Sequence, residues 1–117
     1  MGRRVLVVED EELVADLVSD ALDVEGHETR CVDGTTALEA ALDFQPEVVL
    51  LDLMMPRVDG FEVARRLHGN KETEDTPIVV MTAMYDAASR AGEIGTEYYL
   101  AKPFDIAELL DIVERAK

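Results

Sequence analysis

The sequence has 117 residues, 48% of them hydrophobic, with 26 acidic and 11 basic side chains and a formal net charge of −15 at pH 7. This length suits one domain with a single core. The charge argues against nonspecific nucleic-acid binding, which depends on basic side chains that neutralise phosphates. No apolar run approaches the ~20 residues of a membrane span, and the single cysteine, Cys31, excludes an internal disulfide. Composition therefore predicts one cytoplasmic domain, residues 1–117, that binds neither nucleic acid nor membrane.

The first 46 residues alternate short apolar runs with segments of helical period. The run Val5 to Val8 predicts a first strand, and Glu28 to Val32 predict a second. Between them, six apolar residues recur at helical spacing and predict a helix that Gly26 ends: Leu13, Val14, Leu17, Val18, Ala21 and Leu22. Gly34 is expected to open a second helix, which ends before Pro46 and carries these residues on one face: Ala37, Leu38, Ala41 and Leu42.

The next segment contains the apolar run Val48 to Leu51, which is entered from a proline and stops at Asp52. Such a continuous run is typical of a strand that is buried on both faces of a parallel sheet. Loop signals follow, and then a helix that ends near Gly69 and carries Phe61, Val63, Ala64 and Leu67. Asp52 is therefore predicted at the point where a central strand ends and a loop begins.

The last third of the chain repeats this alternation. Ile78 to Met81 predict a fourth strand and Tyr98 to Ala101 a fifth, with a weak helix over residues 86–94 between them. A final helix is expected to begin after Asp105 as its N-cap. Five strands alternating with five helices predict an α/β fold with a doubly wound, five-stranded parallel sheet and right-handed crossovers.

Polar residues lie at the carboxyl ends of these predicted strands: Glu9, Asp10, Asp52, Thr82 and Lys102. In a flavodoxin-like strand order, 2-1-3-4-5, the first and third strands are neighbours and ligands bind between their carboxyl ends. The three carboxylates would converge there and repel one another unless a cation joins them, and Mg²⁺ prefers such oxygen ligands. A hydroxyl and an ammonium beside them suit a phosphoryl group bridged by a metal.

Four segments, VLVVEDE, VLLDLMMPRVDG, VVMTA and YYLAKPF, in this order and spacing, resemble the receiver domain of two-component response regulators of the chemotaxis type. The resemblance covers the whole chain and implies that Asp52 is the phosphoacceptor of a phosphorelay. It also implies that Asp10 and Asp52 bind Mg²⁺, or Mn²⁺ in its place, directly. Glu9 would act through water, and the backbone carbonyl of Met54 would complete the protein's share of the shell.

The same resemblance assigns the remaining polar residues. Thr82 would contact the phosphoryl oxygens, Lys102 would pair with them, and the Lys102–Pro103 peptide bond is expected to be cis. Movement of Thr82 would free space for Tyr99, the switch aromatic. This step would change the surface formed by the fourth helix, the fifth strand and the fifth helix.

The resemblance also implies partners. The phosphodonor would be a sensor histidine kinase or a histidine phosphotransfer protein. The reader would be a downstream effector or an output domain, which is expected to lie outside this chain. Homodimerisation through the switching surface is left open by the sequence.

The domain is expected to be a self-phosphorylating acceptor with at most slow autophosphatase activity, rather than an enzyme. Met54 and Met84 stand two residues past Asp52 and Thr82, at positions that influence hydrolysis in similar domains. A thioether orients an attacking water poorly, which favours slow loss of the phosphoryl group. Alternatively, both methionines only cover the pocket.

Three other functions would use the same fold or the same residues. A flavin-binding module should carry Ser, Thr and Gly in its first loop to hold a phosphate, whereas residues 9–12 are all acidic. A phosphatase with an aspartyl nucleophile would want an acid in place of Met54. An adaptor that works without phosphorylation would be expected to lack part of the acceptor set, but every side-chain type is present.

Overall fold

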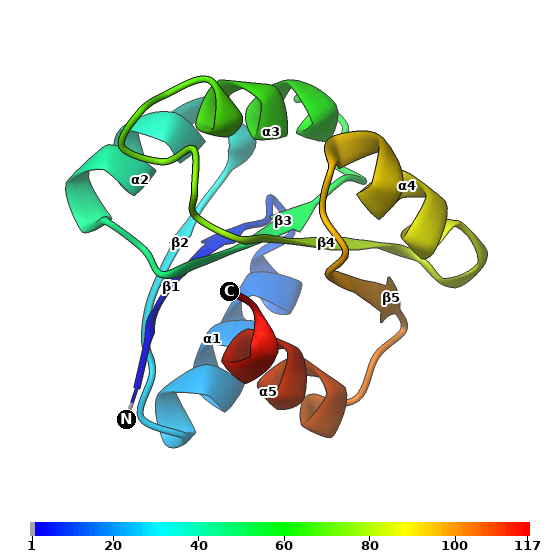
Figure 1. The fold of residues 1–117 in the computed structure, drawn as a ribbon. Coiled ribbons are helices and arrows are strands. Elements are labelled where there is room, and N and C mark those ends of the chain that lie inside the picture. The colour runs from blue at the N-terminus through cyan, green and yellow to red at the C-terminus, as the bar shows by residue number, and fades with distance from the viewer. Residues whose placement is uncertain (1) are drawn as a thin grey trace.

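The computed structural model describes residues 2–117, apart from the side chain of Met84, as a single alternation of strands and helices (Figure 1). The strands are β1 (Arg4–Val8), β2 (Glu28–Val32), β3 (Val48–Asp52), β4 (Ile78–Ala83) and β5 (Tyr99–Lys102). The helices are α1 (Glu12–Val24), α2 (Ala37–Phe44), α3 (Gly60–His68), α4 (Ala87–Ile94) and α5 (Ile106–Arg115). Two 3₁₀ turns, η1 (Gly34–Thr36) and η2 (Met84–Asp86), precede α2 and α4.

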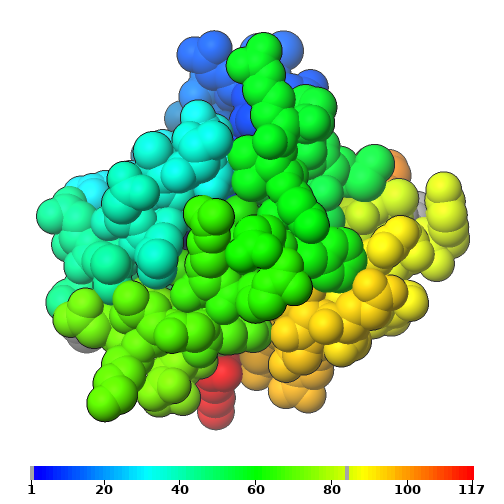
Figure 2. Space-filling model, turned by 90° about the horizontal axis from the view of Figure 1, so that it is seen from above, coloured from blue at the N-terminus to red at the C-terminus, as the bar shows by residue number. Residues whose placement is uncertain are grey.

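All five strands are parallel and lie in the order β2-β1-β3-β4-β5, which confirms the predicted fold class. Helices α1 and α5 cover one face of the sheet, and α2, α3 and α4 cover the other (Figure 1). Figure 2 looks down on the second face and shows α2 in cyan, α3 in green and α4 in yellow and gold across it. The chain reverses its direction of winding between β1 and β3, so that a crevice forms outside their carboxyl ends.

Strand β3 is buried along its whole length, as its continuous apolar run predicted. Val49 and Leu51 belong to the core cluster under α2, α3 and α4, whereas Val48 and Leu50 belong to the cluster under α1 and α5. Alternate side chains thus enter opposite cores, because successive residues of a strand point to opposite faces. This central position carries Asp52 to the edge of the sheet on a rigid support.

Helix α1 buries only part of the apolar set that predicted it. Its buried residues are Ala15, Val18 and Leu22. Leu13 and Leu17 are 80% and 57% exposed, although they belong to the set at helical spacing. The set is too wide for one face, and only the side toward the sheet is covered.

Several element boundaries also differ from the sequence predictions. Strand β5 begins at Tyr99, one residue later than predicted, and β4 continues two residues past Met81. The chain makes a 3₁₀ turn from Gly34 before α2 begins. Asp105 does cap α5, because it accepts the Glu108 N–H while the Glu108 side chain accepts the Asp105 N–H. None of the helices within residues 2–117 combines the length and apolar content that crossing a membrane requires.

Candidate functional site

The site lies where β1 and β3 end side by side. Val8 pairs with Leu51 in the parallel register, so Glu9 and Asp10 leave β1 at the level of Asp52. Carboxylate oxygens of these three residues all lie within 4.8 Å of one another. The three acids that the sequence predicted to converge are therefore brought together by the strand order.

Asp52 is only 2% exposed, and each of its carboxylate oxygens has a contact. Oδ1 accepts a hydrogen bond from the backbone N–H of Met54 at 2.8 Å. Oδ2 lies 3.3 Å from Nζ of Lys102. The loop after β3 thus fixes one side of the carboxylate, and the other side faces a cation.

Lys102 reaches the acids from β5, two strands away from β3. Its ammonium also lies 3.2 Å from Oε1 of Glu9, which is 5% exposed. The other oxygen of Glu9 accepts the N–H of Glu11 at 3.3 Å. One ammonium is therefore shared by two buried carboxylates, a contact that the sequence did not predict for Glu9.

Burial and crowding set the protonation of these groups. Burial, followed by the hydrogen bond and negative charge of Asp52, raises the pKa of Glu9 to about 7, although Lys102 and the Glu11 N–H oppose the rise. Burial alone would lower the pKa of Lys102, but Asp52 and Glu9 raise it above its ordinary value. Lys102 therefore remains charged at neutral pH, and Glu9 can hold a proton.

Thr82 is buried on β4, beside the acids. Its neighbour Met81 pairs with Asp52, and Thr82 itself pairs with Ala101 of β5, one residue before Lys102. The hydroxyl-bearing residue thus stands between the strand of Asp52 and the strand of Lys102. The Lys102–Pro103 peptide bond is cis, as the resemblance implied.

Two glycines let the loop after β3 pack closely, a feature that no local sequence pattern indicated. A Cβ on Gly60 would lie 2.6 Å from Cδ2 of Leu53 and 3.3 Å from the carbonyl oxygen of Asp52. A Cβ on Gly34 would lie 2.6 Å from Cγ1 of Val58. These contacts hold the loop against α3 and η1, and only residues without a side chain fit them.

An apolar groove of about 570 Å³ adjoins the site on the side of Lys102. Its lining comes from α1, from the ends of β4 and β5, and from the loops after β3 and β5: Val14, Leu17, Met54, Ala83, Lys102, Pro103 and Phe104. Met54 is 64% exposed, whereas the side chain of Met84 lies outside the described part of the chain. The surplus of apolar residues on α1 was the available signal for this groove.

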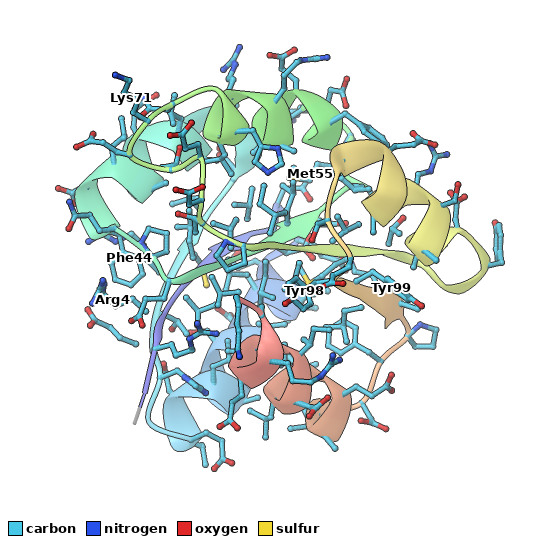
Figure 3. The ribbon with its side chains drawn as sticks, viewed as in Figure 1. Arg4, Phe44, Met55, Lys71, Tyr98 and Tyr99 are labelled. Atoms are coloured by element: carbon cyan, nitrogen blue, oxygen red, sulfur yellow. The ribbon has the colours of Figure 1, made fainter. Side chains whose placement is uncertain are left out.

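The two tyrosines of the YYLAKPF segment lie at β5, where Figure 3 labels them. Tyr98 packs against the core cluster under α1 and α5, and its hydroxyl accepts the N–H of Lys117. Tyr99 is 43% exposed and begins β5. Tyr99 therefore points outward in this structure, three residues before Lys102.

The donor set suits a hard divalent cation. Glu9, Asp10 and Asp52 offer only carboxylate oxygens, and Asp10 is exposed, so that water can complete a shell. Mg²⁺ typically takes one or two carboxylates and keeps several waters. A cation here would also offset the repulsion among the acids.

Comparison with known proteins gives a consistent result. The family profile described as response regulator receiver domain matches residues 5–114. The DNA-binding dual master transcriptional regulator RpaA of Synechocystis is 37% identical over 110 residues, which cover 92% of this chain and 46% of RpaA. The chain spans about half or less of the length of the curated relatives it matches.

Solved structures agree in fold over nearly the whole chain. The chemotaxis response regulator CheY4 of Vibrio cholerae superposes with a TM-score of 0.88 at 27% identity and covers 98% of both chains. The receiver domain of the sensor histidine kinase PA1611 of Pseudomonas aeruginosa has a TM-score of 0.87 at 30% identity, covering 98% of this chain and 97% of that one. The PA1611 structure is described with a magnesium ion coordinated in its active site cleft.

Proposed function

This chain belongs to the response regulator receiver domain family of two-component signalling, and from that premise we propose that Asp52 is its phosphoacceptor. The observation that carries the proposal is the convergence of Glu9, Asp10, Asp52 and Lys102 at one edge of the sheet. Phosphoryl transfer asks mainly for positioning and for neutralisation of charge. A buried carboxylate beside an ammonium and two further acids meets both needs once a cation is bound.

The cation is Mg²⁺, with Mn²⁺ as an alternative. Asp10 and Asp52 would bind it directly, Glu9 through water, and the backbone carbonyl of Met54 would supply a further oxygen. The clustering of the three carboxylates and the oxygen-only donor set support this assignment. The bound cation supplies charge neutralisation at the transferring group, while Lys102 holds the facing oxygen of Asp52.

Thr82 and Tyr99 form the switch. An aspartyl phosphate brings roughly −1.5 to −2 charge units into the site, and the hydroxyl of Thr82 would move toward the new oxygens. Tyr99, now exposed, would turn into the space beside β5 and alter the α4–β5–α5 surface. Helix α4 suits this role because only two alanines, Ala87 and Ala91, are buried along it.

The phosphodonor is a histidine kinase or a histidine phosphotransfer protein, and its docking face includes α1. Leu13 and Leu17 present apolar side chains to solvent, and Leu17 also lines the groove beside Lys102. Exposed apolar surface next to a reacting group marks a protein–protein contact. The reader of the signal is an effector or an output domain. Phosphorylation would also allow homodimerisation through the α4–β5–α5 surface.

The absence of nucleic-acid binding stays a prediction for this chain, because the relative RpaA is named a DNA-binding regulator. We likewise propose that the protein is in the cytoplasm, because the phosphohistidine donor transfers its phosphoryl group there. The domain is proposed to be an acceptor with slow autophosphatase activity. Met54 supports this, because its exposed thioether offers an attacking water only a weak acceptor.

The test is phosphorylation by acetyl phosphate in the presence of Mg²⁺, followed by intact-mass spectrometry. Wild-type protein should gain one phosphoryl group, and chelation of the metal should prevent the gain. Asp52→Asn should abolish it. After the donor is removed, the added mass should persist for minutes or longer.

Asp59→Asn is the matched control, because Asp59 lies in the same loop and caps α3 through its side chain. Asparagine caps a helix about as well as aspartate, so this variant should be phosphorylated like the wild type. A phosphoryl group retained by Asp52→Asn would overturn the acceptor assignment. Loss of the added mass within seconds would overturn the proposed slow hydrolysis alone.

A further inference from the structure

Helix α4 is held to the body of the domain by few apolar contacts. Of its eight residues only Ala87 and Ala91 are buried, and Ile94 packs on the core from a half-buried position. Alanine side chains remove little apolar area from water when they are buried. The position of α4 therefore depends largely on its polar and aromatic contacts.

The main such contact is made by Arg90. Its Nε lies 2.7 Å from Oδ2 of Asp86, and its Nη1 lies 3.7 Å from Oε2 of Glu93. The same guanidinium lies over the ring of Phe61 on α3, 5.7 Å from the ring centroid. The two acids hold the side chain in place along α4, and the ring ties it to the neighbouring helix, which lies beside α4 in Figure 2.

Phe61 directly follows Gly60, the residue of α3 that approaches the backbone of the proposed phosphoacceptor. The backbone N–H of Phe61 donates a hydrogen bond to the side chain of Asp59, which caps α3. The preceding residue, Gly60, approaches Leu53 and the carbonyl of Asp52 so closely that a Cβ would not fit. A continuous set of contacts therefore runs from the backbone at Asp52 through the first turn of α3 to Arg90.

We propose that Arg90 is a positioning residue, which clamps α4 to Phe61 of α3 while Tyr99 faces solvent. The clamp links α4 to the loop after β3, next to Asp52, and this link does not involve Thr82 or Tyr99. This inference deepens the proposed function and rests on it for the coupling to Asp52. The contact between Arg90 and Phe61 itself is independent of what Asp52 does.

The clamp stabilises the arrangement of α4 in which Tyr99 faces solvent. It therefore opposes any ligand of Asp52 that favours the arrangement in which Tyr99 has turned inward. A ligand of Asp52 can shift the switch only by its differential affinity for the two arrangements. Removing the clamp lowers the free energy needed to move α4, so an analogue of the phosphoryl group should bind more tightly. A cation–π contact at a half-exposed site corresponds to roughly a two- to fivefold change in an equilibrium constant.

The experiment measures binding of beryllofluoride with Mg²⁺ by titration calorimetry, together with amide hydrogen exchange, on the full chain. Arg90→Ala removes the clamp and its ion pairs, whereas Phe61→Leu keeps apolar bulk and the ion pairs but removes the aromatic face. Arg65→Ala is the matched control. Arg65 is an exposed arginine of α3 that pairs with Glu62 and contacts no ring among the described residues.

We expect Arg90→Ala and Phe61→Leu each to tighten beryllofluoride binding roughly two- to fivefold, and the double variant to bind no tighter than Arg90→Ala alone. Amides of α4 should exchange faster in both variants, while those of β1 and β3 should not change. Arg65→Ala should match the wild type in both measurements.

Unchanged or weaker binding by Arg90→Ala, or unchanged exchange in α4, would overturn the clamp. A wild-type protein that takes up no beryllofluoride would instead count against Asp52 as acceptor. In that case the exchange comparison between Arg90→Ala and Arg65→Ala still decides whether the clamp exists.

Discussion

At the scale of single residues, Glu9 shows how burial and charge compete in this site. Its carboxylate is almost fully buried, faces the carboxylate of Asp52 and shares the ammonium of Lys102 with it. Desolvation and Asp52 prevail over Lys102, so that the pKa of Glu9 rises from an ordinary 4.5 to about 7. One lysine cannot neutralise two buried acids, and the remaining imbalance is what a divalent cation would relieve.

This shift predicts how stability depends on pH when divalent metal is removed. Between about pH 4.5 and pH 7 the folded protein keeps a proton on Glu9 that the unfolded chain releases. The free energy of unfolding should therefore fall as pH rises through this window, by on the order of 1–3 kcal/mol. Glu9→Gln, which cannot ionise, should lack this part of the decline. Urea denaturation with a chelator present, from pH 4.5 to 8, measures the difference.

The control for that comparison is Glu12→Gln. Glu12 is an exposed acid in the first turn of α1, close to the site in sequence but with no ion pair among the described residues. The free energy of unfolding of Glu12→Gln should depend on pH in the same way as that of the wild type. If Glu9→Gln loses stability with rising pH as steeply as the wild type, burial of Glu9 does not govern its protonation.

At the scale of elements, two glycines of the helices have opposite roles. Gly60 opens α3 where the helix touches Leu53 and the backbone of Asp52, and an added Cβ would lie 2.6 Å from Cδ2 of Leu53. Gly92 lies within α4, and a Cβ added there would point into open space. One glycine is required by close packing, whereas the other only lowers the helical propensity of α4.

Alanine substitutions at these glycines should shift stability in opposite directions. Gly60→Ala forces Leu53 or α3 to move and should destabilise the fold by about 1–3 kcal/mol. Gly92→Ala should stabilise it by about 0.5–1 kcal/mol, because alanine favours a helix over glycine. Urea denaturation of both variants under one condition tests the pair. If Gly60→Ala leaves stability unchanged, α3 does not pack tightly against the loop after β3.

Strands and helices that have a local apolar pattern were predictable from the sequence. Contacts between side chains of different elements were not. The continuous run before Asp52 specified a central strand, and parallel topology then required Glu9, Asp10 and Asp52 to meet at one edge. Nothing in the local pattern told which side of α1 would face the sheet, so the exposure of Leu13 and Leu17 came from the structure. The sharing of Lys102 depends on distances across strands and was equally inaccessible.

At the scale of the whole molecule, the excess of acidic residues lies mostly on the surface. Most of the 26 acids have no cationic side chain within ion-pair distance in the described part of the chain. Asp16 and Asp20 of α1 are examples, both exposed. A net charge of −15 on a chain of 117 residues therefore acts mainly as repulsion within the folded domain.

Salt should therefore stabilise this protein. Raising KCl from 0.1 M to 1 M shortens the screening length from about 10 Å to about 3 Å, which removes most repulsion between separated charges. We expect the free energy of unfolding to rise by on the order of 1 kcal/mol and the melting temperature by roughly 4 °C. The variant with Asp16→Asn and Asp20→Asn carries less repulsion and should gain less from the same salt. A melting temperature that falls as KCl is added would mean that screened ion pairs such as Arg30–Asp43 outweigh the repulsion.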